Sequence, residues 1–231
     1  MYLFYSENIS NNKLSLDESK HCILSLRKKK NDKILITEGK GIIYIAEIIQ
    51  IHNNQVEYTN LSIIKKNKKK IKSHIVISPP KNRVRFEWFL EKVTELGVDM
   101  ITPIICENSE RKKLNKERSQ KILISAMKQS KSAFLPKMNN LIKFKDLLQT
   151  PFKDTYIAHC HNQDINYFHK LICTPTNDTP ITLFIGPEGD FSKKEINFAE
   201  KAGIIPVQLG DQVLRTETAG IVGCSIINLL K

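Results

Sequence analysis

Short apolar runs broken by turn residues fill the first third of the chain. We expect strands at residues 2–5, 33–38, 42–51 and 55–64, with a short amphipathic helix at 17–27. Asn53 and Asn54 stand between the last two strands, and such a pair favours a hairpin because asparagine tolerates positive φ. About sixty residues of short strands predict a small closed barrel, since an open sheet would leave strand edges exposed.

A different period begins near residue 73, where strands alternate with longer amphipathic segments. The expected strands are 74–78, 100–105, 155–159, 181–185 and 206–209, and the expected helices are 83–96, 117–132, 165–173, 192–203 and 217–230. Gly97 ends the first helix, which carries Val84 and Trp88 on its expected apolar face, and Ser192–Glu195 is a capping box. Strict alternation predicts a parallel sheet with helices on both faces.

The change of period divides the chain into two predicted domains, 1–72 and 73–231. A length of 231 residues is compatible with one large domain or two modest ones, each able to bury a core. The basic stretch Lys65–Lys72 lies at the predicted boundary. Two interpretations of it stay open: a solvated linker, or a hinge that touches nucleic-acid phosphates.

Composition places the chain among ordinary soluble proteins, with 41% hydrophobic and 26% charged residues. No apolar run approaches the roughly 18 residues that a membrane span needs. The first seven residues, Met1–Glu7, lack the basic and apolar regions of a signal peptide. We therefore expect a cytoplasmic protein without membrane contact.

The formal net charge of +12 indicates a polyanionic partner and favours a nucleic acid. The alternative is that the lysine excess only covers solvated surfaces. Only six of the 36 basic residues are arginine, and arginine alone offers a rigid fork for phosphate or carboxylate. Arg83, Arg85 and Arg215 lie beside the motifs described below, which makes them the more informative basic residues.

The five cysteines are odd in number, widely spread and free of any C-x-x-C pair, which argues against a disulfide framework and a zinc ribbon. His159–His161 holds two histidines around a cysteine, with His169 and Cys173 downstream. Successive residues on a strand point to opposite faces, so Cys160 would not converge with the two histidines on one metal ion. We expect no metal site.

Two strand ends in the last fifty residues carry the pattern of a ligand site. Gly186–Gly189 follows one buried strand and Leu209–Leu214 follows the next. Glycines allow a ligand close to the backbone, and Leu209, Val213 and Leu214 could enclose a flat apolar ring. The plain alternative is that both segments only make turns. The sequence lacks the fingerprints of a common dinucleotide site, a P-loop NTPase and an α/β-hydrolase, which argues against these three classes.

The motifs together resemble one family over essentially the whole chain, the ribosomal RNA small-subunit methyltransferase E (RsmE) family of the SPOUT superfamily. The segments that carry the resemblance are Lys81–Arg83, Thr94–Val98, Ile185–Gly189, Phe191–Ser192, Leu209–Gly210 and Leu214–Ala219. The resemblance implies an α/β protein with an RNA-binding PUA-like β-barrel, then a SPOUT-type parallel-sheet domain with a trefoil knot. It also implies S-adenosyl-L-methionine as cofactor, a homodimer, and methylation at N3 of one uridine in the decoding region of 16S rRNA in the small ribosomal subunit.

The resemblance also implies a set of site residues. The cofactor pocket would consist of Gly186, Glu188, Gly189, Leu209, Gly210, Gln212, Val213 and Leu214. Three positions depart from the family pattern. Asp190 stands where glycine is usual, which could narrow the cofactor loop. Asn108 and Lys131 replace expected arginines, which could weaken contacts with RNA.

The implied chemistry assigns roles to a few charged residues. A uridine N3 must lose its proton before it attacks a methyl group, so the protein must stabilise the uracil anion and accept the proton. Arg215 is the candidate for stabilising the charge, and Glu217 for the base or for orienting Arg215. The alternative is an Arg215–Glu217 contact that only shapes the loop. Candidates for RNA phosphate contacts are Arg27, Lys28, Lys29, Lys30, Arg83 and Arg85.

Two further functions stay open at this point. One is a methyltransferase of the same superfamily with another RNA target, for instance ribose 2′-O-methylation of tRNA. The other is a non-catalytic RNA-binding or ribosome assembly factor. Cofactor binding separates the second from an enzyme, and the chemical identity of the product separates the two enzymes.

Overall fold

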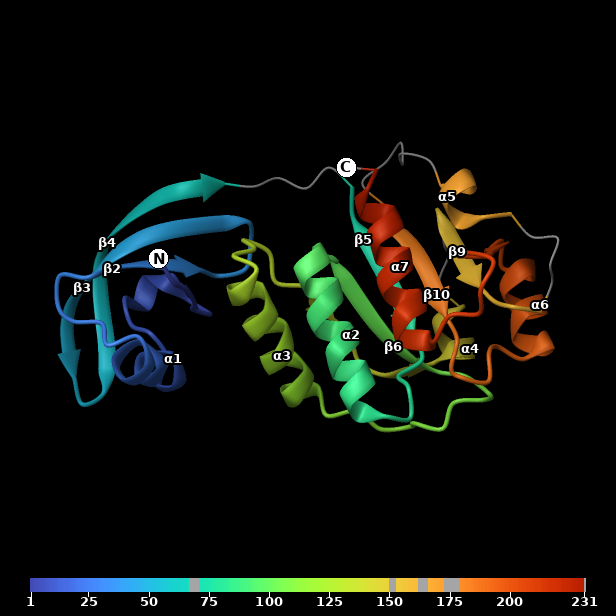
Figure 1. Cartoon of the computed structure of the whole chain (residues 1–231), viewed down its shortest axis with the longest axis horizontal. Helices are drawn as coiled ribbons and strands as arrows, with labels where there is room; N and C mark the ends of the chain where they lie inside the picture. The colour runs from blue at the N-terminus through green and yellow to red at the C-terminus, as the bar shows by residue number, and fades with distance from the viewer. Residues whose placement is uncertain (67–70, 150–152, 162–165, 173–178, 231) are drawn as a thin grey trace. The chain divides into compact units, whose positions relative to one another are not determined.

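The computed structural model describes residues 1–66, 71–149, 153–161, 166–172 and 179–230 (Figure 1). The chain divides into two compact units, Met1–Lys68 with Ile124–Leu135, and Lys69–Leu123 with Pro136–Lys231. Residues 124–135 thus group with the first unit, although the period of the sequence places them in the second domain. Residues 67–70 of the basic connector, and residues 165 and 173 of an expected helix, lie outside the described residues.

The first unit contains a four-stranded sheet in the order β1-β2-β3-β4. Its strands are β1 (Leu3–Tyr5), β2 (Lys33–Thr37), β3 (Ile42–His52) and β4 (Gln55–Lys66). β1 runs parallel to β2, and the other neighbours are antiparallel. Asn53 and Asn54 both have positive φ, 47° and 60°, which confirms the predicted hairpin.

Between β1 and β2 the chain forms a 3-10 turn η1 (Ile9–Asn11), the helix α1 (Leu16–Lys20) and a π-helical turn η2 (His21–Ser25). The amphipathic helix predicted at 17–27 is therefore present as α1 and η2. The core of this unit consists of fully buried side chains from the sheet and these turns, including Phe4, Leu14, Ile34, Ile48 and Tyr58. The sheet agrees with the predicted strands, and its closure into a barrel stays a prediction.

The second unit is built on a parallel sheet in the order β11-β9-β10-β5-β6-β7, with β8 paired to β6. Its longer strands are β5 (Ser73–Ile77), β6 (Met100–Ile105), β9 (Thr155–Ala158), β10 (Ile181–Ile185) and β11 (Ile205–Val207). All recorded pairings in this sheet are parallel, which confirms the predicted sheet type. The two-residue strands β7 (Lys137–Met138) and β8 (Ile142–Lys143) were not predicted.

The helices after β5 are α2 (Arg83–Leu96), α3 (Lys116–Gln129), α4 (Phe144–Leu147), α5 (Phe168–Leu171), α6 (Lys193–Lys201) and α7 (Thr216–Asn228). α2 begins at Asn82, whose side chain accepts the Val84 N–H, and ends at Gly97 with φ 87°. The capping box predicted at Ser192 and Glu195 is present at the start of α6. Across the described ranges, no helix combines the length and apolarity that crossing a membrane requires.

Successive residues of the central strands point to opposite faces of the sheet, and both faces are covered. On one face, Val76 and Phe184 pack with Phe144 of α4 and Ile196 of α6. On the other face lies α7 beside α2 (Figure 1). A Cβ added to Gly223 of α7 would come within 2.1 Å of the Leu183 side chain, so the helix backbone lies directly on the sheet. This confirms the prediction of helices on both faces.

One prediction for α2 was wrong. Val84 and Trp88, expected on its apolar face, are 65% and 45% exposed. The buried stripe of the helix consists of Phe86, Phe89, Leu90 and Val93. This spacing of three and four residues is the helical repeat, and positions 84 and 88 fall outside it.

Candidate functional site

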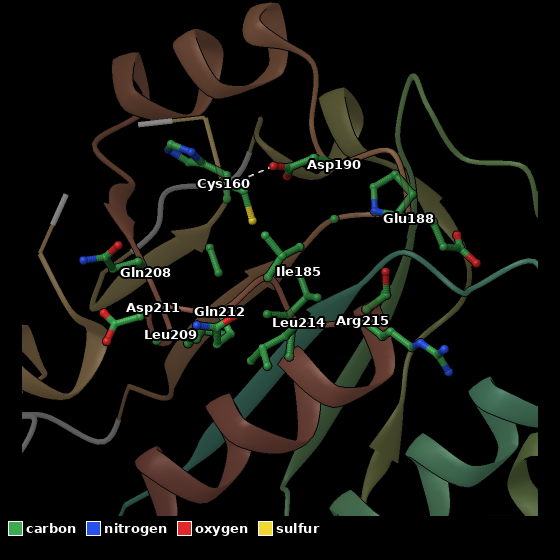
Figure 2. Close-up of a pocket in the computed structure, with 18 of the residues that line it drawn as sticks. Cys160, Ile185, Glu188, Asp190, Gln208, Leu209, Asp211, Gln212, Leu214 and Arg215 are labelled. Carbon is green, nitrogen blue, oxygen red and sulfur yellow. Dashed lines mark hydrogen bonds between the residues drawn. The ribbon is translucent and has the colours of Figure 1, made fainter. Parts of the chain in front are cut away.

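A cavity of about 630 Å³ opens where β9, β10 and β11 end (Figure 2). Its size lies within the usual range for small-molecule sites, and its place at the carboxyl ends of parallel strands is typical of α/β proteins. Most of the predicted cofactor residues line it: Gly186, Glu188, Leu209, Gly210, Gln212, Val213 and Leu214. Gly189, the remaining one, does not line the cavity and instead contacts Asn108.

The cavity wall combines apolar side chains with bare backbone. Leu209, Leu214 and Ile185 contribute apolar surface, whereas Val213 is 82% exposed. A Cβ added to Gly210 would meet nothing within 4 Å, so this glycine leaves backbone accessible to a ligand. At Gly186 the reason for glycine differs, because a Cβ there would lie 3.1 Å from Phe191. Gly186 serves packing, and Gly210 borders open space.

Asp190 closes one side of the cavity in a left-handed backbone conformation, with φ 59°. Its Oδ2 accepts the Cys160 N–H at 2.8 Å, and its Oδ1 accepts the Phe191 N–H at 2.7 Å. Figure 2 shows the link from Asp190 to Cys160 across the cavity edge. The carboxylate thus ties the loop after β10 to the end of β9.

Asn108 adds a third segment to the same loop. Its Nδ2 donates to the carbonyls of Gly189 and Asp190 at 3.0 and 3.1 Å. A Cβ at Gly189 would lie 3.3 Å from the Asn108 Cβ, which is tighter than an ordinary contact. Two of the three positions that depart from the expected residues, Asn108 and Asp190, therefore meet in one hydrogen-bonded cluster.

The His159–His161 segment lies beyond the end of β9. His161 donates its backbone N–H to His159 Nδ1 at 3.2 Å, and its Nε2 donates to the Phe191 carbonyl at 2.8 Å. Burial lowers the pKa of His159, which keeps its ring neutral. Among the residues that the structure describes, no group of three His, Cys, Asp or Glu side chains is arranged to hold a metal ion, and Cys173 is not described.

Arg215 and Glu217 lie at the start of α7, where the alternative interpretation expected a contact between them that only shapes the loop. Arg215 is the N-cap residue and lines the cavity, and Figure 2 shows its side chain directed away from Leu214. Glu217 is 4% exposed, and its Oε1 lies 3.6 Å from Arg85 Nε. Its Oε2 is buried without a hydrogen-bond partner. The recorded partner of Glu217 is thus Arg85 rather than Arg215.

Comparison with known proteins decides the family. The profile of a family described as "RNA methyltransferase domain" matches residues 67–228, and one described as "RNA methyltransferase PUA domain" matches residues 15–58. A protein of Buchnera aphidicola named ribosomal RNA small subunit methyltransferase E is 31% identical, covering 88% of this chain and 84% of its own length. The chain belongs to the RsmE family.

Solved structures of RsmE-like proteins extend the likeness over the whole chain. A probable rRNA methyltransferase from Porphyromonas gingivalis is 33% identical, with a TM-score of 0.91 and coverage of 100% of this chain and 98% of its own. The Neisseria gonorrhoeae methyltransferase E, solved with bound S-adenosylmethionine, is 25% identical, with a TM-score of 0.84 and coverage of 100% and 98%. The mixed α/β fold with a PUA domain is therefore that of the RsmE family.

Several cavity residues of this RsmE family member were missed by the sequence analysis. Cys160 and Tyr167 line the cavity, and the Tyr167 hydroxyl donates to Asp211. The end of the strand at 155–159 was a usable signal for Cys160, because parallel strands end at one edge of a sheet. Tyr167 had no comparable signal, since it reaches the site through the isolated bridge to Gln208.

The predicted RNA contacts lie on both units. Arg27, Lys29 and Lys30 are exposed in the first unit, where Lys28 Nζ lies 3.9 Å from Asp32 Oδ2. In the second unit the side chains of Arg83 and Arg85 are 62% and 38% exposed, and each pairs with a carboxylate. Lys131 has a φ of 52° in the turn after α3. Their contacts with RNA stay a prediction.

Proposed function

We propose that this chain transfers the methyl group of S-adenosylmethionine to N3 of one uridine in the decoding region of 16S rRNA. The observation that carries the proposal is the cavity at the ends of β9, β10 and β11, formed by the motifs of the RsmE family. Relatives named for small-subunit rRNA methylation and neighbours solved with S-adenosylmethionine support it.

The residues of the cavity fit this cofactor. Accessible backbone at Gly210, apolar side chains at Leu209 and Leu214, and polar groups at Gln212 and Glu188 supply the surfaces that an adenosine and an amino-acid moiety require. When bound, the cofactor supplies an electrophilic methyl group. The protein's own task is to hold that group in line with the attacking nitrogen.

Arg215 and Glu217 are the residues that we propose for the proton and charge at uridine. Arg215 lies at the cavity rim, where a guanidinium can stabilise the negative charge that develops on the uracil ring. Glu217 does not line the cavity but lies buried beside its wall, and one of its oxygens has no hydrogen-bond partner; in this proposal that oxygen accepts the proton from N3. The Arg85 guanidinium holds the other oxygen and orients the carboxylate.

We infer the wider assignments from membership of the family. Residues 1–72 would form a closed PUA-like barrel that binds RNA through Arg27 to Lys30. Residues 73–231 would form the SPOUT methyltransferase domain with its trefoil knot. The enzyme would act in the cytoplasm as a homodimer, which sedimentation would detect as twice the chain mass of 26.5 kDa. A species of single-chain mass would contradict the dimer.

Nucleoside mass spectrometry tests the proposal directly. Small ribosomal subunits that lack the modification are incubated with the protein and S-adenosylmethionine, and 3-methyluridine is expected at one site. A methyl group on another atom or on another RNA would indicate a different target. Cofactor binding without any transfer would favour the non-catalytic RNA-binding or ribosome assembly factor.

A further inference from the structure

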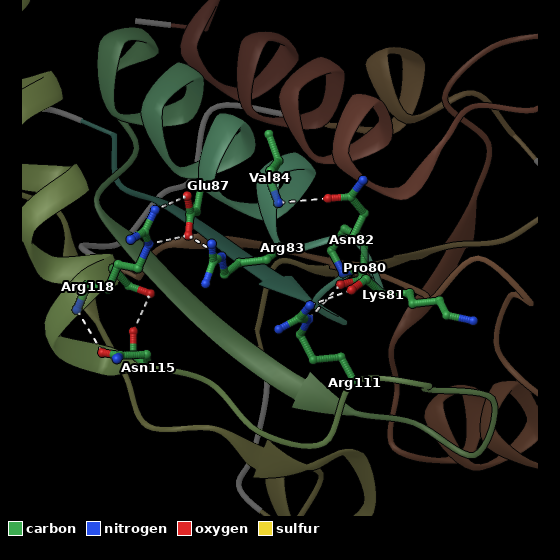
Figure 3. Close-up of polar contacts among 10 residues, drawn as sticks. Pro80, Lys81, Asn82, Arg83, Val84, Glu87, Arg111, Asn115 and Arg118 are labelled. Atoms are coloured by element: carbon green, nitrogen blue, oxygen red, sulfur yellow. Dashed lines mark hydrogen bonds and ion pairs between the residues drawn. The ribbon is translucent and has the colours of Figure 1, made fainter.

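Three of the chain's six arginines gather beside the start of α2, each from a different segment (Figure 3). Arg83 lies in the first turn of α2, Arg111 in the loop after β6, and Arg118 in the first turn of α3. Arginine is scarce among the 36 basic residues, so three at one place are unlike the scattered lysines. The side chain that connects two of them is Glu87 of α2.

Glu87 holds two guanidinium groups at once. Arg118 donates from Nε to Oε1 at 2.5 Å and from Nη2 to Oε2 at 2.9 Å, which is a bidentate pair. Arg83 Nε lies 3.2 Å from the same Oε1. The hydrogen bond from Arg118, together with the positive charges of Arg118, Arg83 and Arg111, lowers the pKa of Glu87. The carboxylate therefore stays ionised and fixes the directions of both arginine side chains.

The backbone beneath these side chains is fixed as well. Arg111 donates from Nε to the Pro80 carbonyl at 2.9 Å, and from Nη2 to the Lys81 carbonyl. The Asn115 side chain accepts the Arg118 N–H at 2.9 Å at the start of α3. These contacts, visible in Figure 3, hold the turn before α2 and the start of α3 in place.

Exposure shows which groups remain accessible. The Arg83 and Arg118 side chains are 62% and 52% exposed, whereas Glu87 is 19% exposed. The contacts to Glu87 use only part of the five N–H donors of each guanidinium. Exposed ion pairs contribute little to stability, typically about 0–1 kcal/mol. Stability alone therefore gives little reason for two arginines on one carboxylate.

We propose that Arg83 and Arg118, held in position by Glu87, form a two-armed site for a backbone phosphate of the substrate RNA. The proposal rests on the proposed function, which makes RNA the partner. Arginine forks bind phosphate oxygens through paired N–H groups, and phosphate contacts set the register of an RNA without reading its bases. Glu87 is a positioning residue, and Arg118 extends the set of RNA contacts expected from the sequence.

Substitution of Arg118 tests the phosphate contact. Affinity for a 16S rRNA fragment of the decoding region is measured by fluorescence anisotropy over a range of salt concentrations. Arg118→Ala should weaken binding roughly tenfold and reduce the slope of log affinity against log salt by about one. Arg118→Lys keeps the charge but not the fork, so an intermediate loss is expected. The matched control is Lys194→Ala on the exposed surface of α6, which removes one positive charge elsewhere.

Substitution of Glu87 separates positioning from charge. Glu87→Gln raises the net charge by one, so a purely electrostatic surface would bind RNA more tightly. We expect weaker binding, because the two guanidinium groups lose their common anchor. Glu200→Gln, an exposed residue of α6, makes the same change of charge and should not weaken binding. Circular dichroism melts establish that each variant is folded.

Equal behaviour of Glu87→Gln and Glu200→Gln, or of Arg118→Ala and Lys194→Ala, would overturn the phosphate site. Calorimetric affinity for S-adenosylmethionine should be the same in all four variants, and a parallel loss there would also overturn it. A wild-type chain that binds RNA but transfers no methyl group would contradict the proposed function alone. The loss of RNA affinity in Arg118→Ala would support the phosphate site even then.

Discussion

Asp190 occupies a backbone conformation that costs most L-residues about 1–2 kcal/mol and costs glycine nothing. Its carboxylate accepts two backbone N–H groups, from Cys160 and Phe191, and hydrogen bonds to a charged group are worth roughly 1.5–3 kcal/mol each. The aspartate therefore offsets its own strain. Asn108 supports the same loop through the carbonyls of Gly189 and Asp190.

Arg215→Ala tests the residue proposed to stabilise charge on the uracil. Removal of one such group typically costs about a hundredfold or more in turnover. We expect a loss of that order in single-turnover methylation, with little change in the calorimetric affinity for S-adenosylmethionine, because the side chain points away from Leu214. Equal losses in both quantities would make Arg215 a support of the cavity.

His74 gives the stability of the protein a dependence on pH. Burial, and then the charge of Lys137, lowers the pKa of His74 to about 4, and its ring contacts the hydroxyls of Thr102 and Thr182. The unfolded chain binds a proton near pH 6.5 whereas the folded chain does not. The contribution of neutral His74 to the free energy of unfolding is complete above pH 6.5. It falls by about 3 kcal/mol as the pH drops from 6.5 to 4. Denaturant unfolding at several pH values measures it.

The matched variants for His74 are His74→Gln and His52→Gln. The first should lose this part of the pH dependence, whatever its stability at neutral pH. The second changes an exposed histidine and should retain it. If the free energy of unfolding of His74→Gln changes with pH between 6.5 and 4 as it does in the wild type, His74 is not the source of this pH dependence.

At the scale of elements, the pairing of α2 with α7 explains where the charged residues gather. Arg85 pairs with Glu217 near the start of both helices, and Asn228 donates to the Leu96 carbonyl at their ends, so the helices run parallel. Each follows a strand that ends at the same edge of the sheet. The two helix starts therefore lie together beside the cavity, and their partial positive charge favours anionic groups there.

Gly220→Ala tests the close approach within this pair. A Cβ there would lie 2.5 Å from the Phe89 ring and 3.1 Å from Ile77. Overpacking of this kind costs about 1–3 kcal/mol, which outweighs the gain of about 1 kcal/mol in helix propensity. Urea unfolding should give a lower midpoint for Gly220→Ala, whereas Ser225→Ala on the same helix should change it little. A higher urea midpoint for Gly220→Ala would show that the Phe89 and Ile77 side chains move aside without cost.

At the scale of the whole molecule, the chain has two compact units, so the unfolding of one unit can be followed separately from that of the other. Trp88, the single tryptophan, lies in the second unit with the cavity, so its fluorescence reports that unit. A ligand that binds only the folded state at a hundred times its dissociation constant adds about 2.7 kcal/mol. S-adenosylmethionine should raise the fluorescence-detected midpoint by roughly 5–10 °C.

Gly210→Val provides the control for that experiment. Its side chain would project where nothing lies within 4 Å, so the fold should persist while the cavity is partly filled. The shift caused by S-adenosylmethionine should then be lost. A shift of equal size in Gly210→Val would place the bound cofactor elsewhere.

The sequence by itself determined the elements whose signals are local. The bounds of α2 and β10 were predicted to the residue, because Gly97 ends the helix and turn residues bracket the buried strand. The cavity-lining segments were also predictable, since both follow buried strands and the family motifs lie there. A glycine, a cap or a period acts within a few residues, so the chain carries it without tertiary context.

Only the tertiary structure decided which side chains meet. Glu217 pairs with Arg85, and Glu87 with Arg118, across separations that no local pattern spans. The two-residue strands β7 and β8, which pair with β6, and the four-residue helix α4 were not predicted, because such short segments carry no periodic signal. The error at Val84 and Trp88 of α2 is different, because the buried stripe Phe86, Phe89, Leu90 and Val93 follows the helical repeat and was readable in the sequence. A side chain's partner depends on how whole elements pack, and that packing is a property of the fold.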